Sequence, residues 1–232
     1  MKVVILCGGK GTRLSEETKL VPKPMVKIGN KPILTHIMNI YSNYGFRKFI
    51  LALGYKHEII EKYYKKNKKF EIKCVFTGEN TMTGGRLLRL KKYFNKNENF
   101  MMTYGDGLTN QNLRSLLKSH IRNKSIATMT VVRPPVRFGE VKLRKNKIVK
   151  FKEKPQASEG WINGGFFVLN SKIFDFINGD SQMFEREPIE KLTARKELMA
   201  FKHSGFWQCM DTMRDKNLLN NLIKNKRAPW IT

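Results

Sequence analysis

The chain is poor in acidic side chains. It has 19 Asp and Glu residues against 45 Lys and Arg, a formal net charge of +26 over 232 residues. Its only aspartates are Asp106, Asp175, Asp180, Asp211 and Asp215. Because carboxylates are scarce, an aspartate that lies beside glycines or just after a strand is an informative candidate for binding a metal ion.

Cysteines and long apolar runs are also scarce. The three cysteines, Cys7, Cys74 and Cys209, match no zinc-ligand spacing, so we assign them no chemical role and expect a reducing, cytoplasmic setting. No apolar stretch approaches the roughly 20 residues of a membrane-spanning helix. The first residues also lack the architecture of a signal peptide. We therefore expect no membrane partner.

The excess of basic residues raises the question of a nucleic-acid ligand. The lysines are spread over expected helix faces and turns, as between Lys62 and Lys69, and form no single stripe interleaved with aromatic side chains. We therefore expect no specific nucleic-acid partner, although a non-catalytic, basic RNA-binding protein stays an alternative. A positive field also attracts small anionic substrates such as nucleoside triphosphates and sugar phosphates.

A glycine-rich turn follows the first apolar run. Val3 to Cys7 leads into Gly8-Gly9-Lys10-Gly11-Thr12-Arg13-Leu14, and Lys23-Pro24 follows in a short loop. Glycines let backbone N–H groups approach an anion, because they lack a Cβ and tolerate positive φ. The spacing fits neither a Walker A loop nor the Rossmann fingerprint. Arg13 offers a planar fork for phosphate groups, and Lys23 offers a point charge. Surface solvation is the alternative for both.

Strands and helices alternate along the first half. We expect strands at 2–7, 48–53, 71–76 and 100–104, a helix that begins at Pro32, and helices near 56–66, 86–94 and 110–122. Repeated βα units predict an α/β fold, with a Rossmann-like, mostly parallel mixed sheet and helices on both faces. In such sheets ligands bind beyond the carboxyl ends of the strands. The glycine turn and Asp106 both lie at those ends.

The second half is richer in strands. We expect them at 126–133, 138–144, 147–152, 163–169 and 206–209, with helices near 171–178, 185–195 and 212–224. Asp211 follows the last of these strands, and its position alone favours a helix N-cap. Asp106, between Gly105 and Gly107, leaves room for a metal ion or a phosphate, and an Asp-Gly turn is its alternative.

Several motifs resemble one enzyme family. L-x-G-G-x-G-T-R-L followed by P-K-P resembles the signature of sugar-1-phosphate nucleotidyltransferases. Longer segments across nearly the whole chain are similar to those of the glucose-1-phosphate cytidylyltransferases; they are 78–86, 104–107, 161–167, 205–208, 210–216 and 228–230. The resemblance implies transfer from CTP to α-D-glucose 1-phosphate with Mg²⁺, giving CDP-glucose for polysaccharide biosynthesis. The same chemistry with UTP, dTTP or another phosphorylated substrate stays an alternative.

The resemblance also implies roles for individual residues. The implied nucleotide-binding set is Leu6, Cys7, Gly8, Gly9, Lys10, Gly11, Thr12, Arg13, Lys23, Thr81, Arg86 and Gly105. The implied sugar-phosphate-binding set is Gly139, Glu153, Lys154 and Asn163. Asp106 and Asp211 become the magnesium ligands and, with Arg13 and Lys23, the catalytic residues. We predict one domain over residues 1–232, in which residues up to about 125 bind the nucleotide and the strand-rich remainder binds the sugar phosphate.

The chain departs from the family in two ways. Between 54–56 (Gly-Tyr-Lys) and 77–79 (Thr-Gly-Glu), some two dozen residues usual in the family are expected to be missing. In the family this stretch is associated with subunit contacts, so we expect a homo-oligomer but do not carry over the hexamer described for relatives. Val21 replaces a lysine common in the family, which leaves one cation fewer near Lys23.

Overall fold

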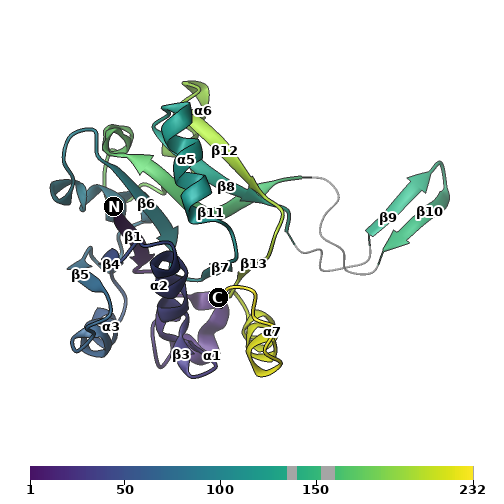
Figure 1. The fold of residues 1–232 in the computed structure, drawn as a ribbon, viewed down its shortest axis with the longest axis horizontal. Coiled ribbons are helices and arrows are strands. Elements are labelled where there is room, and N and C mark those ends of the chain that lie inside the picture. The colour runs from purple at the N-terminus through teal and green to yellow at the C-terminus, as the bar shows by residue number, and fades with distance from the viewer. Residues whose placement is uncertain (135–139, 153–159, 232) are drawn as a thin grey trace.

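A seven-stranded sheet forms the centre of the molecule (Figure 1). The computed structural model describes residues 1–134, 140–152 and 160–231, and the strand order of the main sheet is β12-β8-β11-β6-β1-β4-β5. The strands are β1 (Lys2–Cys7), β4 (Lys48–Leu53), β5 (Glu71–Phe76), β6 (Asn99–Tyr104), β8 (Ala127–Val132), β11 (Ile162–Asn170) and β12 (Leu198–His203). Only β11 runs antiparallel to its two neighbours in this sheet, β6 and β8. The mostly parallel mixed sheet confirms the predicted fold class.

The central strand β1 contributes to two cores, one on each face of the sheet. Val3, Ile5 and Cys7 belong to one apolar cluster, and Val4 and Leu6 belong to the other. This alternation explains the unbroken apolar run in the sequence, because a strand covered on both faces needs apolar side chains on both.

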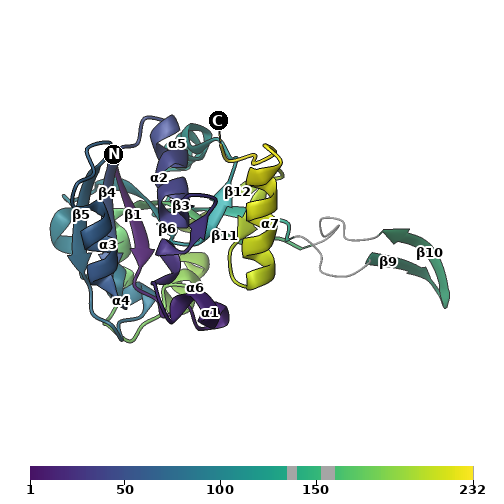
Figure 2. The same ribbon diagram turned by 90° about the horizontal axis from the view of Figure 1, so that it is seen from below.

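Helices cover both faces, as predicted (Figure 2). Those that pack into the first cluster are α2 (Ile33–Asn43), α3 (His57–Tyr64), α5 (Leu113–Asn123) and α7 (Met213–Lys224). Those that pack into the second are α4 (Thr83–Leu88) and α6 (Glu187–Ala194). Among the described residues, none of the helices has the length and apolarity that crossing a bilayer requires.

The expected helix at 86–94 is wrong in its bounds. Helix α4 begins at Thr83 and ends at Leu88, and a short 3₁₀ helix follows at Lys91–Tyr93. Gly84 and Gly85 therefore lie inside the helix, where the segment around residues 180–184 packs directly on them. A Cβ on Gly85 would lie 2.4 Å from Asp180 Cα. The two glycines permit close packing here and do not interrupt the helix.

Other differences lie in short elements. The segment expected as a helix at 171–178 is a 3₁₀ helix, Ser171–Phe176, and strand β12 was not expected. Two-stranded sheets are formed by β9 (Glu140–Arg144) with β10 (Lys147–Lys152) and by β2 (Lys27–Ile28) with β3 (Lys31–Pro32). The short elements near the glycine turn are η1 (Thr12–Leu14), α1 (Ser15–Thr18) and η2 (Lys23–Met25). The strand-rich character of the second half is confirmed, whereas its assignment to sugar binding stays a prediction.

A small antiparallel pair joins the two halves of the chain at the site. Strand β13 (Trp207–Cys209) pairs with β7 (Gly107–Thr109), a strand that the sequence did not predict. The backbone N–H of Met210 also donates to the carbonyl oxygen of Asp106, at 2.9 Å. The two aspartates of interest, Asp106 and Asp211, are therefore held side by side although they lie in different halves.

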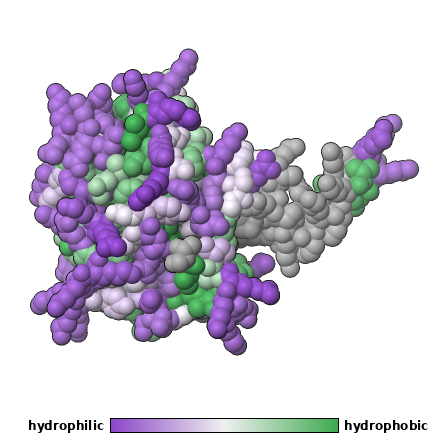
Figure 3. Space-filling view, in the orientation of Figure 1, coloured by the Kyte–Doolittle hydropathy of each residue, from purple (hydrophilic) through white to green (hydrophobic). Residues whose placement is uncertain are grey.

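The surface is hydrophilic over the face drawn in Figure 3. Hydrophilic residues are spread over the main body and alternate with small apolar areas. This agrees with the expectation of a solvated surface on that face, and the absence of a specific nucleic-acid partner stays a prediction.

Candidate active site

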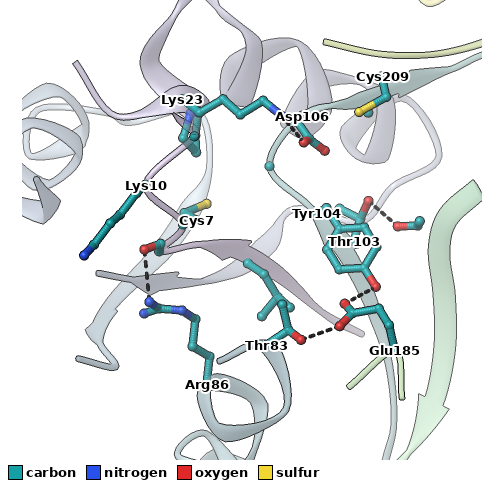
Figure 4. A pocket seen from close by; sticks show the side chains of 18 of the residues that line it. Cys7, Lys10, Lys23, Thr83, Arg86, Thr103, Tyr104, Asp106, Glu185 and Cys209 are labelled. Atoms are coloured by element: carbon teal, nitrogen blue, oxygen red, sulfur yellow. Dashed lines mark hydrogen bonds and ion pairs between the residues drawn. The ribbon is translucent and has the colours of Figure 1, made fainter. Parts of the chain in front are cut away.

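A pocket of about 810 Å³ lies at the carboxyl ends of β1 and β6 (Figure 4). Every residue of the predicted nucleotide-binding set lines it, and so do Asp106, Asn163 and Asp211. The other predicted sugar-site residues, Gly139, Glu153 and Lys154, lie outside the described residues. The structure thus brings the described members of both sets to one cavity, and their contacts with a substrate stay predictions.

The glycine turn forms one wall of the pocket, and packing restricts its glycines to different degrees. Gly11 has a φ of +65°, and a Cβ there would lie 2.9 Å from Thr18 Cγ2, so another residue would be strained. A Cβ on Gly8 would lie 2.1 Å from the guanidinium of Arg86, whereas one on Gly9 would meet nothing within 4 Å. Packing within the described protein therefore does not require a glycine at position 9.

Arg86 lies beneath the turn with a side chain that is almost fully buried. Its guanidinium donates five hydrogen bonds of 2.6 to 3.1 Å, to Thr77 Oγ1 and to the carbonyl oxygens of Gly8, Leu53, Gly78 and Glu79. Burial, together with the nearby Arg89 charge, lowers the pKa of Arg86. These bonds tie together the ends of β1, β4 and β5. The predicted contact of Arg86 with the nucleotide stays a prediction.

A cluster of opposite charges lies next to the turn. Lys23 Nζ is 2.6 Å from Asp106 Oδ2 and 2.5 Å from Asp211 Oδ1. Arg13 Nη1 is 2.9 Å from Asp211 Oδ2. Burial opposes the charge of Lys23, but the two carboxylates outweigh it and raise the pKa of the ammonium group. Burial would likewise raise the pKa of Asp211, yet Lys23 and Arg13 hold it below its ordinary value.

Asp211 does not cap the following helix. Thr212 is the N-cap of α7, and its hydroxyl oxygen accepts from the backbone N–H of Asp215. Asp215 in turn accepts from the backbone N–H of Thr212, at 2.9 Å, which completes a capping box. The N-cap interpretation of Asp211 is therefore wrong, and its carboxylate contacts Lys23 and Arg13. Asp106 does lie in a turn after β6, but the strand that follows pairs with β13 and forms no hairpin with β6.

The donor set suits a hard divalent cation. Within the described part of the chain, Asp106, Cys209 and Asp211 offer ligand atoms that lie within 4.8 Å of one another. Carboxylate oxygens are preferred by Mg²⁺. Burial, followed by the charge of Asp106, raises the pKa of the Cys209 thiol, so the protonated thiol is a poor ligand for such an ion. Lys23 Nζ contacts the carboxylates of both Asp106 and Asp211. Its position shows that a single cation can contact the two carboxylates at once.

Three further residues of the pocket were not predicted as site residues. The hydroxyl groups of Tyr104 and Thr83 donate to the two carboxylate oxygens of Glu185, at 2.6 and 2.5 Å (Figure 4). Tyr104 is the last residue of β6, directly before Gly105. Its place at the carboxyl end of a strand is a sequence signal from which a site residue could have been predicted. No local pattern distinguishes Glu185 from other glutamates, because tertiary packing alone places it there.

The chain is similar to known enzymes over its whole length. The nucleotidyl transferase family model matches residues 2–215. Glucose-1-phosphate cytidylyltransferase of Salmonella typhimurium is 43% identical, with 100% of this chain and 99% of that protein covered. The probable glucose-1-phosphate cytidylyltransferase of Bacillus subtilis is 41% identical, with 99% of each covered. The Salmonella alignment spans 255 positions against 232 residues here, in agreement with a shortened chain.

Solved structures show the same fold. The crystal structure of HddC from Yersinia pseudotuberculosis complexed with GMP-PN has a TM-score of 0.75 and 25% sequence identity, and covers 96% of this chain and 99% of that one. This chain and HddC therefore share one architecture over nearly the full length of both.

Proposed function

The chain belongs to the nucleotidyl transferase family, and from this premise we propose that it transfers a cytidylyl group from CTP to α-D-glucose 1-phosphate, giving CDP-glucose and pyrophosphate. Full-length similarity at 43% identity to a glucose-1-phosphate cytidylyltransferase supports the substrates. The observation that carries the chemistry is the convergence of Lys23, Asp106 and Asp211 beside a glycine turn in one pocket.

The reaction needs no activated protein nucleophile. An oxygen of the sugar phosphate forms a bond to the α-phosphorus of CTP, the bond from that phosphorus to the bridging oxygen breaks, and pyrophosphate leaves with the electron pair. Two polyanions have to be held in line while negative charge builds up on the α-phosphate and the leaving group. Positioning and electrostatic stabilisation therefore supply most of the rate.

The residues of the pocket match these demands. The glycine turn presents backbone N–H groups to the triphosphate. The Lys23 side chain is 13% exposed and pairs with Asp106 and Asp211, and its proposed role is to offset charge on the α-phosphate. The Arg13 side chain is 74% exposed, so its guanidinium has the freedom to turn from Asp211 to the β- and γ-phosphates.

We propose Mg²⁺ as the cofactor, held by Asp106 and Asp211. When bound, it supplies neutralising charge to the triphosphate and the leaving group. Homo-oligomerisation and a cytoplasmic location also stay predictions. Light scattering on the purified chain measures the first directly.

A panel of pyrophosphate-release assays tests the proposed function. CTP, UTP, dTTP and GTP are each combined with glucose 1-phosphate, mannose 1-phosphate and galactose 1-phosphate, with and without Mg²⁺. GTP is included because a similar fold was solved with GMP-PN bound. We expect the highest kcat/KM for CTP with glucose 1-phosphate. A better pair of substrates would contradict the specific assignment, and parallel assays of Asp106→Asn exclude a contaminating activity.

A further inference from the structure

One carboxylate in the pocket is held by neutral groups. Glu185 Oε1 accepts a hydrogen bond from the Tyr104 hydroxyl, and Oε2 accepts one from the Thr83 hydroxyl. Within the described residues these two hydroxyls are its hydrogen-bond partners, and neither cancels its charge. Each carboxylate oxygen keeps a second lone pair for another donor.

Both hydroxyls are themselves fixed by the surrounding structure. Thr83 begins α4, and its hydroxyl oxygen accepts from the backbone N–H of Phe184, at 2.9 Å. The Tyr104 ring packs on Gly165, where a Cβ would lie 2.8 Å from Tyr104 Cδ2. The carboxylate is therefore oriented before any substrate enters.

The pocket has two ends of different character. We call the glycine turn with Arg13, Lys23, Asp106 and Asp211 the phosphate end. We call Thr83, Tyr104 and Glu185 the sugar end, after the role proposed below, although Thr83 lies between the predicted nucleotide contacts Thr81 and Arg86. Figure 4 shows Lys10 and Glu185 well apart across the pocket, and both line it.

The charge of Glu185 decides what it can face. An uncompensated carboxylate repels phosphate groups, so it suits a part of the substrate that carries neutral donors. A sugar ring offers several hydroxyl donors. Through Tyr104 and Gly165, Glu185 is tied to β11, the strand that also carries Asn163, a predicted sugar contact.

We propose that Glu185 accepts hydrogen bonds from hydroxyl groups of the sugar ring and thereby selects which sugar 1-phosphate reacts. Thr83 and Tyr104 act as positioning residues that aim its carboxylate. The proposal rests on the proposed function and adds a specificity-determining residue to it.

Steady-state kinetics of Glu185→Gln test the proposal first. The amide keeps the shape of the side chain but removes the charge and one acceptor. Because a hydrogen bond to a charged group is involved, we expect the KM for glucose 1-phosphate to rise about 10- to 100-fold, with the KM for CTP changed less than about twofold. Glu187→Gln is the matched control, since Glu187 lies on the same segment, is about half exposed and pairs with Lys191. A rise in the KM for CTP instead, as contact with the cytosine amine would give, overturns the proposal.

A series of deoxy sugars sharpens the test. Glucose 1-phosphate and its 2-, 3-, 4- and 6-deoxy analogues are assayed with the wild type, Glu185→Gln and Tyr104→Phe. We expect the wild type to lose about tenfold or more in kcat/KM on removal of at least one hydroxyl, and Glu185→Gln to lose much less at that same hydroxyl. Equal losses in both proteins overturn the proposal. If Glu185→Gln does not fold, Tyr104→Phe provides the same comparison. If the wild type prefers another sugar 1-phosphate, the substrate assignment fails, and the same series on that sugar still decides the role of Glu185.

Discussion

The two ends of the pocket hold their charges in opposite ways. At the phosphate end, Lys23, Asp106 and Asp211 each have a partner of opposite sign within 2.6 Å. At the sugar end, Glu185 is held by two hydroxyl groups and keeps its charge uncompensated among the described residues. Charges that offset one another can exchange partners when an anionic substrate and a metal ion arrive. A carboxylate that is fixed by neutral donors stays in place when substrate binds, and it can only accept hydrogen bonds from that substrate.

The comparison leads us to assign different tasks to the two ends. Under the proposed function the phosphate end neutralises charge that changes during the reaction, so we expect it to govern kcat. Under the proposed role of Glu185 the sugar end recognises groups that do not change, so we expect it to govern the KM for the sugar phosphate. Four substitutions, taken from the largest expected effect to the smallest, test this division.

Asp106→Asn is expected to have the largest effect. Under the proposed metal role, loss of the Asp106 carboxylate removes electrostatic stabilisation of the transition state, and kcat/KM should fall by about 10³-fold or more. Initial rates of pyrophosphate release measure it. Asp175→Asn, at an exposed acid paired with Lys91, is the control and should change the rate less than about twofold. Intact turnover of Asp106→Asn would show that the metal role is wrong.

Lys23→Ala should come next and act mainly on kcat. An ammonium group that interacts most strongly as charge builds up contributes to the transition state more than to substrate binding, so we expect kcat to fall about 10²-fold while the KM for CTP changes less than about threefold. Lys27→Ala, an exposed lysine on β2, controls for the loss of surface charge. An unchanged kcat would assign Lys23 to binding alone and break the contrast between the two ends.

Arg86→Lys tests whether the phosphate end depends on the layer beneath it. A lysine cannot replace the fork that reaches five acceptors, so the free energy of unfolding should fall by about 2–3 kcal/mol and kcat/KM by about tenfold. Urea unfolding and initial rates measure both. Arg89→Lys, whose partner is the exposed Asp180, should cost less than about 1 kcal/mol. Unchanged stability together with a raised KM for CTP would instead indicate that Arg86 binds the nucleotide directly.

Tyr104→Phe should have the smallest effect of the four substitutions. This effect should be limited to the KM for the sugar phosphate. Removal of one of the two hydroxyls that orient Glu185 should raise the KM for glucose 1-phosphate about three- to tenfold and leave the KM for CTP unchanged. Because the pKa of Tyr104 lies well above 10 in the folded protein, its hydroxyl stays protonated as pH rises. The ratio of variant to wild-type KM should therefore be constant from about pH 7 to pH 9. A ratio that changes over that range, or an effect on the KM for CTP, would contradict the positioning role.

Local patterns predicted the phosphate end well. The apolar run before Gly8, the glycines of the turn and Asp106 after a buried strand are short-range signals, and the rule that ligands bind beyond the carboxyl ends of parallel strands places them together. Asp211 could not be assigned in this way. Its position depends on the pairing of β13 with β7, which joins distant parts of the chain, and only the family resemblance pointed to it.

Long-range packing explains what the sequence did not show. Gly84 and Gly85 were expected to precede a helix, and their place inside α4 depends on a segment about a hundred residues further along the chain that packs against them. The Glu185 carboxylate is held in the pocket by hydrogen bonds from hydroxyl groups on α4 and β6. Both elements are far from Glu185 in the sequence. The role of Arg86 as a support for three strand ends likewise follows from contacts that no local pattern encodes.

A crystal structure with CDP-glucose bound tests both ends of the pocket in one measurement. The diphosphate should lie against the glycine turn within hydrogen-bond distance of Lys23 Nζ, and a glucose hydroxyl should donate to a carboxylate oxygen of Glu185 while Tyr104 and Thr83 keep their bonds to it. A diphosphate bound away from the turn, or a glucose ring that does not contact Glu185, would contradict the division of the pocket into a phosphate end and a sugar end.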